Sequence, residues 1–413
     1  ISPRRDYSEA FPPRCLFVEK TAALQNTSTL PVNVKRHTHV ADIRHSSTTT
    51  PTQIRHQNDV IKMVHNHSED RFKYLPTVKK VTPPDPSKIV TDPDNRMTPD
   101  EKKLFIDINN RFSERFTPTP GRYNGAWGPV DNSIKFTTPP VQTSKVTSPN
   151  YSQDMKENMV LKMNELIDAG VLIRPEELGL TVEFLSPSIL VPKPDGTWRL
   201  VTDFTMLNRI IQRDASSSPT INDAKLELTR KKFRCELDLS NYYFQHGLRR
   251  EDAAFLGIQH PTRGTFVYAS SPQGLMNSAE KAYGLLGRIF GDMIEEGRLT
   301  RVADSVYPLG DSMKELARNY AEVLRRAEIC NLTFRPEKTI INPRASVIFG
   351  WILDDGEWRP QPHVISSLVR AEVPKTCKQL RSFLGAYKQI NMCLPDYSVL
   401  LSPFEKVLSS RAS

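Results

Sequence analysis

Two aspartates stand where an apolar strand pattern ends and where a hairpin pattern turns. Asp238 lies near the end of the strand-like run 233–239, and Asp304 lies with Ser305 at the predicted bend of a hairpin from Leu299 to Leu309. A fold that brings both carboxylates together would offer Mg²⁺ the oxygen ligands it prefers. Asp-Ser is also ordinary turn chemistry, so position alone leaves a metal site and a simple turn both open.

The elements that would position these residues begin with clear local signals. Thr98-Pro99-Asp100-Glu101 is a capping box and predicts a helix that begins at Pro99. Methionines 155, 159 and 163 with Leu166 form one apolar face, which predicts a second, core-facing helix that ends near Gly170. Apolar β-formers flank Pro-Asp-Gly in residues 187–201, which predicts two strands joined by a turn.

Strand and helix patterns then alternate to the end of the chain. We expect a strand at 264–269, a helix after Pro272-Gln273-Gly274, and a helix opened by the capping box at Ser312. Strands at 345–350 and 351–353 precede a last helix capped by Thr376. This order predicts an α+β fold in which helices cover one face of a sheet.

Residues 1–97 differ in composition from the rest of the chain. They hold six of the nine histidines, a Ser/Thr tract and several prolines, with little apolar periodicity. The histidines suggest zinc, but their spacing does not repeat and only Cys15 accompanies them, so a solvated segment is favoured. We predict a disordered or weakly folded linker over residues 1–97.

Composition limits the class of protein. The chain has 413 residues and a formal net charge of +9, which favours an anionic partner such as nucleic acid. No apolar run reaches 18 residues, so no membrane association is predicted. The five scattered cysteines form no CxxC pair and favour a reducing compartment. The chain begins at Ile1, which we interpret as part of a longer protein.

Seven local motifs, in order along residues 97–408, resemble those of the reverse transcriptases of gypsy-like long-terminal-repeat retrotransposons and, more distantly, of retroviruses. They are Val191-Pro-Lys-Pro-Asp-Gly-Thr-Trp-Arg199, Val201-Thr-Asp-Phe-Thr-Met-Leu-Asn208, Leu237-Asp-Leu-Ser-Asn-Tyr-Tyr-Phe-Gln245, Pro272-Gln-Gly-Leu-Met-Asn-Ser278, Leu332-Thr-Phe-Arg-Pro-Glu-Lys338, Phe349-Gly-Trp351 and Lys378-Gln-Leu-Arg-Ser-Phe-Leu-Gly-Ala-Tyr387.

The resemblance implies the right-hand polymerase fold, with a palm of antiparallel strands backed by helices. Residues 98–150 would lead into the polymerase region, and the fingers would comprise 151–218 and 246–272. The palm would comprise 219–245 and 273–352, and the thumb, incomplete or whole, would occupy 353–413.

In such enzymes the palm carries three carboxylates that hold two Mg²⁺ or Mn²⁺ ions. By resemblance, Asp238 and Asp304 are metal ligands, Leu239 also contacts metal, and Ser305 stands where the family has a second paired aspartate. A neutral hydroxyl is a poorer ligand for a hard cation than a carboxylate, so this departure predicts impaired catalysis. Asp311 lies beyond the hairpin and is not expected to reach back.

The resemblance also implies contacts with nucleotide and primer. Lys193 and Arg199 would grip the triphosphate, and Tyr243 would exclude a ribose 2′-hydroxyl. Gln273 and Gly274 would lie under the nascent base pair. Without their motifs these residues would be interpreted as surface charges, a half-buried aromatic and a helix entry.

Two further roles come from the same resemblance. Lys338 would donate a proton to pyrophosphate, and Phe349, Gly350 and Trp351 would form a primer grip.

Two functions stay open at this point. One is an RNA-directed DNA polymerase that binds a primer–template duplex and deoxynucleoside triphosphates with reduced activity. The other is a catalytically inactive polymerase fold that binds nucleic acid. The resemblance implies a retrotransposon polyprotein in a cytoplasmic retroelement particle, with entry into the nucleus as a further option.

Overall fold

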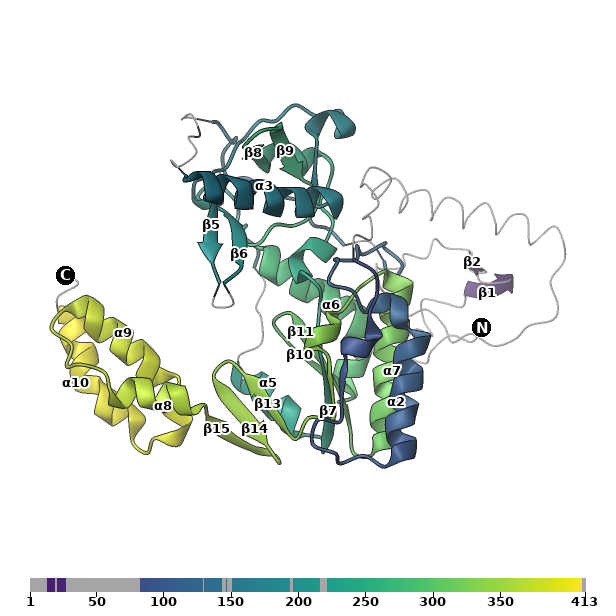
Figure 1. Ribbon diagram of the computed structural model, residues 1–413, viewed down its shortest axis with the longest axis vertical. Coiled ribbons are helices and arrows are strands. Elements are labelled where there is room, and N and C mark those ends of the chain that lie inside the picture. The colour runs from purple at the N-terminus through teal and green to yellow at the C-terminus, as the bar shows by residue number, and fades with distance from the viewer. Residues whose placement is uncertain are drawn as a thin grey trace.

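The computed structural model describes most of the chain from residue 82 onward (Figure 1). The described residues are strands β1, Pro13–Val18, and β2, Thr21–Asn26, and residues 82–410 except 129, 143–145, 147–150, 194–195 and 216–220. Most of the predicted linker 1–97 lies outside these residues. Within 82–97 the prediction is wrong, because Ile89 is buried in the main core and strand β3, Val90–Thr91, joins the main sheet. A two-residue strand is too short to produce a periodic sequence pattern.

A five-stranded sheet lies mainly in the segments predicted as palm, and we call it the palm sheet. Its strand order is β10-β11-β7-β12-β3, and all neighbours are antiparallel except β12 and β3. The bounds are β10, Leu299–Val302; β11, Ser305–Gly310; β7, Phe233–Asp238; and β12, Ile340–Ile341. Side chains alternate along β7, so Cys235 and Leu237 face one side of the sheet and Arg234, Glu236 and Asp238 the other.

Three helices and the sheet share the main hydrophobic core. They are α2, Pro99–Arg111; α6, Ser278–Glu295; and α7, Met313–Cys330. Leu237 and Val306 of the sheet are fully buried with Leu286 of α6 and Val323 of α7. The predicted capping box at Thr98 is confirmed, and Ser312 accepts a hydrogen bond from the backbone of Glu315 to begin α7. These local caps explain why the sequence located both helix starts.

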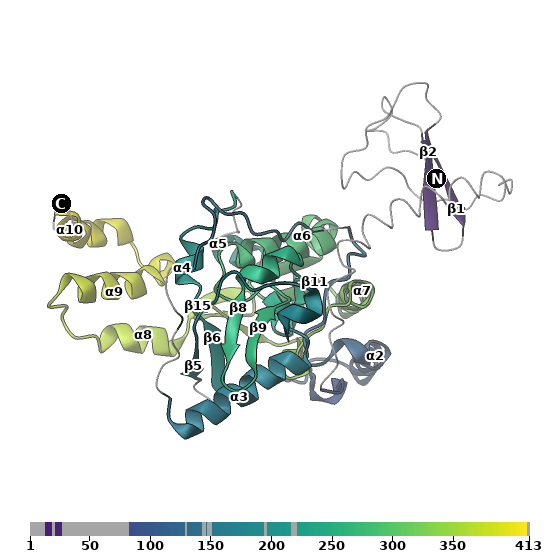
Figure 2. The same ribbon diagram turned by 90° about the horizontal axis from the view of Figure 1, so that it is seen from above.

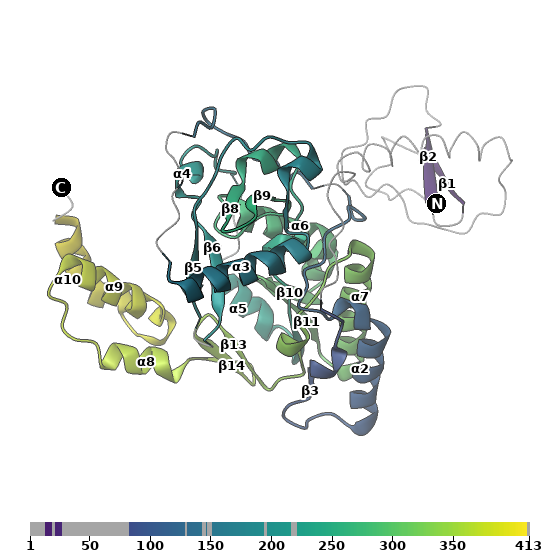
Figure 3. The same cartoon turned by 45° about the horizontal axis from the view of Figure 1, so that its top comes forward.

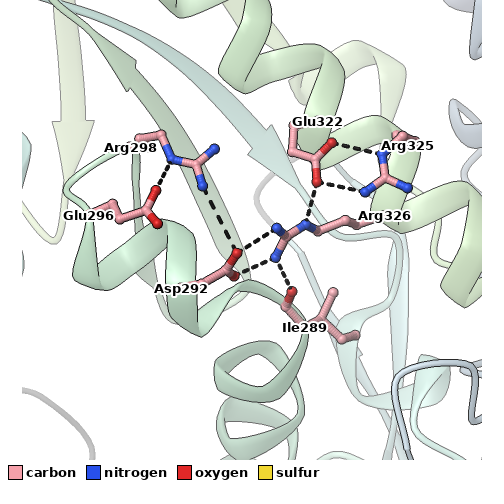
Figure 4. Close-up of polar contacts among 7 residues, drawn as sticks. All are labelled: Ile289, Asp292, Glu296, Arg298, Glu322, Arg325 and Arg326. Atoms are coloured by element: carbon pink, nitrogen blue, oxygen red, sulfur yellow. Dashed lines mark hydrogen bonds and ion pairs between the residues drawn. The ribbon is translucent and has the colours of Figure 1, made fainter. Parts of the chain in front are cut away.

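A buried arginine joins α6 to α7 behind the sheet (Figure 4). Arg326 makes two ion-pair contacts with Asp292, at 2.5 and 2.7 Å, and its Nε donates to Glu322 at 2.7 Å. A further guanidinium N–H donates to the Ile289 carbonyl at 2.7 Å. The guanidinium fork thus satisfies one carboxylate and one carbonyl on α6 and one carboxylate on its own helix.

The opposite face of the palm sheet contacts a three-stranded sheet and α5, Ile221–Thr229. The strands of this second sheet are β13, Ala345–Ile348; β14, Trp351–Asp354; and β15, Glu357–Pro360. Arg234 donates from Nε to Ser346 Oγ at 2.6 Å and from its guanidinium to the Leu353 carbonyl at 3.2 Å. Leu309 of the palm, Leu228 of α5 and Leu353 share a small core.

The predicted fingers form a separate hydrophobic core. Helix α3, Gln153–Asp168, buries Met159 and Met163 there and packs Leu166 against them, as predicted, whereas Met155 is only partly buried and lies outside this core. The predicted hairpin in 187–201 is confirmed as β5, Ser188–Pro192, and β6, Trp198–Thr202. The other elements are β4, Leu172–Ile173; β8, Gly257–His260; β9, Gly264–Tyr268; and α4, Thr205–Asn208.

The C-terminal part consists of three helices set to one side of the sheets (Figure 2, Figure 3). They are α8, Pro362–Val369; α9, Cys377–Lys388, which begins at the predicted Thr376 capping box; and α10, Tyr397–Ser410. Short 3-10 helices complete the described elements: η2, Pro86–Lys88; η3, Ser113–Arg115; η4, Pro175–Leu178; η5, Tyr242–Gln245; η6, Glu251–Phe255; η7, Pro336–Lys338; and η8, Asn391–Cys393. No helix in the described part of the chain is long and apolar enough to span a membrane.

Candidate active site at the tip of the palm

The two candidate aspartates meet at one end of the palm sheet. Asp238 is the last residue of β7, and Ser305, the first residue of β11, is its partner across the strands. The Leu239 backbone N–H donates to the Asp304 carbonyl at 2.9 Å. The structure therefore brings Asp238, Leu239, Asp304 and Ser305 together.

The bend of the aspartate hairpin differs by one residue from the prediction. Val302 pairs with Ser305, so the two turn residues are Ala303 and Asp304, not Asp304 and Ser305. Ala303 has a φ of 52°, the left-handed conformation that tight two-residue turns use. Ser305 consequently lies on strand β11 and not in the turn.

Asp238 is held by two basic side chains. Lys338 Nζ lies 3.0 Å from Asp238 Oδ2, and Arg335 Nε lies 3.7 Å from Oδ1. Burial raises the pKa of the Asp238 carboxyl, and the Asp304 charge raises it further while Lys338 and Arg335 lower it. The effect of Asp304 on this pKa agrees with two neighbouring carboxylates.

Tyr243 lies beside the same tip on η5. It is half-buried, and its ring centroid is 5.3 Å from that of Tyr242. Burial raises the pKa of the Tyr243 phenol, and the negative charge of Asp304 raises it further. The pKa of Tyr243 therefore responds to the charge of Asp304.

The fingers hairpin carries its two predicted basic residues on a strand and in the turn that joins the strands. Arg199 lies on β6 and is exposed, whereas Lys193 follows β5. The Lys193 backbone donates to Thr197 at 2.8 Å and accepts from Gly196, whose φ is 78°. Both side chains are thus presented on a closed two-stranded hairpin away from the hydrophobic core.

Two asparagines fix the loop that contains Gln273 and Gly274. Asn208 donates to the Gly274 carbonyl at 2.9 Å and accepts from the Met276 backbone at 2.9 Å. Asn277 donates to the Gln212 carbonyl at 2.8 Å. Gln273 is exposed, and Gly274 has a φ of 91°, which favours glycine.

The three residues predicted as a primer grip occupy different environments. Phe349 and Gly350 form the β13–β14 turn, and Phe349 is 54% exposed with a φ of 48°. Trp351 is buried, and the Lys225 ammonium lies 3.1 Å from its ring centroid. The structure thus leaves Phe349 accessible and encloses Trp351.

The donor set at the tip does not suit a pair of divalent cations. It contains two carboxylates, one hydroxyl and the Leu239 backbone carbonyl, and Asp238 already contacts two cationic side chains. Within the described residues, no three histidine, cysteine, aspartate or glutamate side chains gather into a group able to hold a metal ion. Two closely spaced divalent ions need more negative charge than two partly neutralised carboxylates provide.

Three contributors to the site were absent from the predicted site residues. Arg335, Asn208 and Asn277 all lie inside the recognised motifs, but their types suggested no chemistry of their own. Arg335 contacts Asp238 through an ion pair and a backbone hydrogen bond, and the two asparagines hydrogen-bond around the 272–278 loop. Only the folded chain reveals these contacts.

Comparisons with known proteins identify chains of similar sequence and fold. Residues 191–351 match the family model described as reverse transcriptase (RNA-dependent DNA polymerase). The chain is 23% identical over 322 residues to the Transposon Tf2-7 and Tf2-8 polyproteins of Schizosaccharomyces pombe, which covers 78% of this chain. The chain spans only 23% of the length of those relatives.

Solved structures show the same fold. A foamy viral protease-reverse transcriptase in complex with RNA/DNA hybrid matches with a TM-score of 0.65 at 18% identity, covering 81% of this chain and 44% of that one. The complex of that viral protein with dsDNA also matches with a TM-score of 0.65 at 18% identity, covering 77% and 64%. The predicted α+β right-hand polymerase fold is confirmed. Residues 191–351 are thus similar to the reverse transcriptase family, and the chain is similar over 322 residues to retrotransposon polyproteins.

Proposed function

We propose that this chain is the polymerase region of a gypsy-like retrotransposon reverse transcriptase whose rate of DNA synthesis is reduced by Ser305. The observation that carries the proposal is the meeting of Asp238 with Asp304 at the end of β7, beside Tyr243. The match of residues 191–351 to the family supports it. Its partners are a primer–template duplex and deoxynucleoside triphosphates.

Each predicted residue has a role in this proposal. Lys193 and Arg199 bind the triphosphate from the fingers hairpin, because an ammonium and a guanidinium both suit phosphate oxygens. Tyr243 presents its ring to the sugar and excludes a 2′-hydroxyl by contact. Gln273 and Gly274 support the nascent base pair on the loop that Asn208 holds.

Other roles follow from where side chains are accessible. Phe349 and Gly350 contact the primer strand. Trp351, which is buried, packs beneath the surface and supports the turn that these two residues form. Lys338 donates a proton to pyrophosphate only if its ammonium leaves Asp238. The family relation implies a general dependence on divalent metal ions. We propose two Mg²⁺ or Mn²⁺ ions as the cofactors of an active form, in which Lys338 has left Asp238 and an aspartate stands at position 305.

The charges at the same tip also favour a second function, which is binding of a duplex without DNA synthesis. Ser305 removes one negative charge, and Lys338 with Arg335 neutralises much of what remains. A polymerase fold with this tip would retain its phosphate contacts and lose its chemistry. For either function we propose a cytoplasmic retroelement particle as the location, with entry into the nucleus as a further step.

Restoring aspartate at position 305 separates the two functions. Ser305→Asp should raise single-turnover primer extension by at least about a hundredfold, because a lost metal ligand costs several kcal/mol and about 1.4 kcal/mol is tenfold. Ser305→Asn is the matched control, since it has the shape of aspartate without the charge. It should raise extension little.

Duplex affinity measured on the same variants completes the experiment. Normal binding with rescued extension supports the impaired polymerase. Normal binding without rescue supports the binding module, and weak binding by every variant contradicts both functions.

A further inference from the structure

The two oxygens of the Asp238 carboxylate are each approached by a separate cation. Lys338 Nζ is 3.0 Å from Oδ2, and Arg335 Nε is 3.7 Å from Oδ1. The Asp238 side chain is only 13% exposed, so little of it is open to solvent. Two nearby cations offset the negative charge of the carboxylate, so its attraction for a further cation is weaker.

Arg335 is fixed in this position by its own contacts. Its guanidinium donates to Asn241 Oδ1 at 2.8 Å, and its backbone N–H donates to the Asp238 carbonyl at 2.9 Å. Its carbonyl accepts from Thr339 Oγ1 at 2.8 Å. Hydrogen bonds of both its side chain and its backbone therefore hold Arg335 beside Asp238.

Lys338 is placed by the turn that follows Arg335. Both residues belong to the segment around η7, and the Lys338 N–H donates to the Arg335 carbonyl at 3.3 Å. This segment lies beside β7, because the backbones of Arg335 and Asp238 are hydrogen-bonded. The two cations thus reach Asp238 from one short, internally bonded turn.

The formal charges at the tip balance. Asp238 and Asp304 supply two negative charges, Lys338 and Arg335 supply two positive charges, and Ser305 supplies none. An aspartate in place of Ser305 would leave the tip with an excess negative charge. The serine therefore makes the formal charges of these five side chains sum to zero instead of to one negative charge.

We propose that Lys338 and Arg335 act as built-in counter-ions of Asp238 and take the place of a divalent cation at this tip. The inference concerns the same tip as the proposed function and rests on it for the orientation of the site. Lys338 is the displaceable member of the pair, since its side chain is 53% exposed and that of Arg335 is 28% exposed. Binding of the duplex is then independent of divalent cations.

Direct binding of Mn²⁺ tests this inference without reference to activity. Electron paramagnetic resonance of free Mn²⁺, titrated with the purified full chain, should give only weak binding for the parent protein. Lys338→Gln should tighten Mn²⁺ binding at least about tenfold, because it removes a positive charge next to Asp238. Ser305→Asp should also tighten it, and the double variant should bind most tightly.

Lys314→Gln is the matched control. Lys314 is an exposed lysine on α7, so its loss lowers the net charge equally without changing the tip. Circular dichroism verifies that each variant is folded. Tight binding of Mn²⁺ by the parent, or equal affinities for Lys338→Gln and Lys314→Gln, would overturn the inference.

Duplex binding measured with Mg²⁺ and with a chelator distinguishes this inference from the proposed function. Equal affinity in both solutions supports the inference, and an affinity that falls in the chelator contradicts it. Failure to bind duplex in either solution contradicts the proposed function, while the Mn²⁺ titration still decides the role of Lys338.

Discussion

His246 is a buried imidazole whose environment makes the fold sensitive to acid. It is 2% exposed, and neither ring nitrogen has a hydrogen-bond partner in the described structure. Burial, together with the positive charges of Lys281 and Arg288, lowers the pKa of His246 to about 3. The unfolded histidine titrates near 6.5, so the unfolded chain binds more protons between these values, and stability falls as the pH drops through that window.

His246→Leu should remove this acid sensitivity. Between pH 7 and pH 4.5 the parent should lose about 2 to 3 kcal/mol more free energy of unfolding than the variant. Urea unfolding at the two pH values measures the difference. His363→Leu, at an exposed histidine, is the control and should behave as the parent does. Equal losses for His246→Leu and His363→Leu would show that His246 is not the responsible group.

At the scale of elements, the contact between α6 and α7 depends on one arginine. Arg326 is buried and is the residue that bonds Asp292, Glu322 and the Ile289 carbonyl in Figure 4. Arg326→Lys should lower the free energy of unfolding by about 1–3 kcal/mol, because an ammonium cannot reproduce the fork. The loss stays within this range because the Asp292 side chain is 54% exposed and solvent screens its charge.

Arg325→Lys is a neighbouring control on the same helix. Arg325 pairs with Glu322 alone among the contacts drawn in Figure 4, and its side chain is 48% exposed. Its substitution should change stability by less than about 0.5 kcal/mol in denaturant unfolding. If both variants lose the same stability, the α6–α7 contact does not depend on the Arg326 fork.

At the scale of the whole molecule, the net charge of +9 predicts binding that depends on salt. Phosphate contacts release counter-ions, so the affinity for a primer–template should fall at least about tenfold between 50 and 200 mM salt. Fluorescence anisotropy across that range measures the slope. Ser305→Asp should leave the slope unchanged, because the tip is not the source of the phosphate contacts. An affinity that is weak and flat across salt would contradict duplex binding.

The sequence by itself determined the features that rest on local chemistry. Capping boxes at Thr98 and Thr376 located helix starts, because these hydrogen bonds join residues three positions apart. The 187–201 hairpin and the strand ending at Asp238 were predictable from turn residues and β-formers. The ordered motifs indicated the polymerase fold, because so many independent patterns rarely occur in one order by chance.

The tertiary structure alone decided what each residue contacts. No local sequence pattern predicts that Arg335 and Lys338 contact Asp238, about one hundred residues earlier. Nor does one predict that Trp351 is buried against Lys225 while Phe349 stays exposed. The pairing of β3 with β12 likewise joins segments that lie far apart in the described chain. Such contacts depend on which strands become neighbours and on which charges then lie close together. The pattern of residues along one segment gives no information on either point.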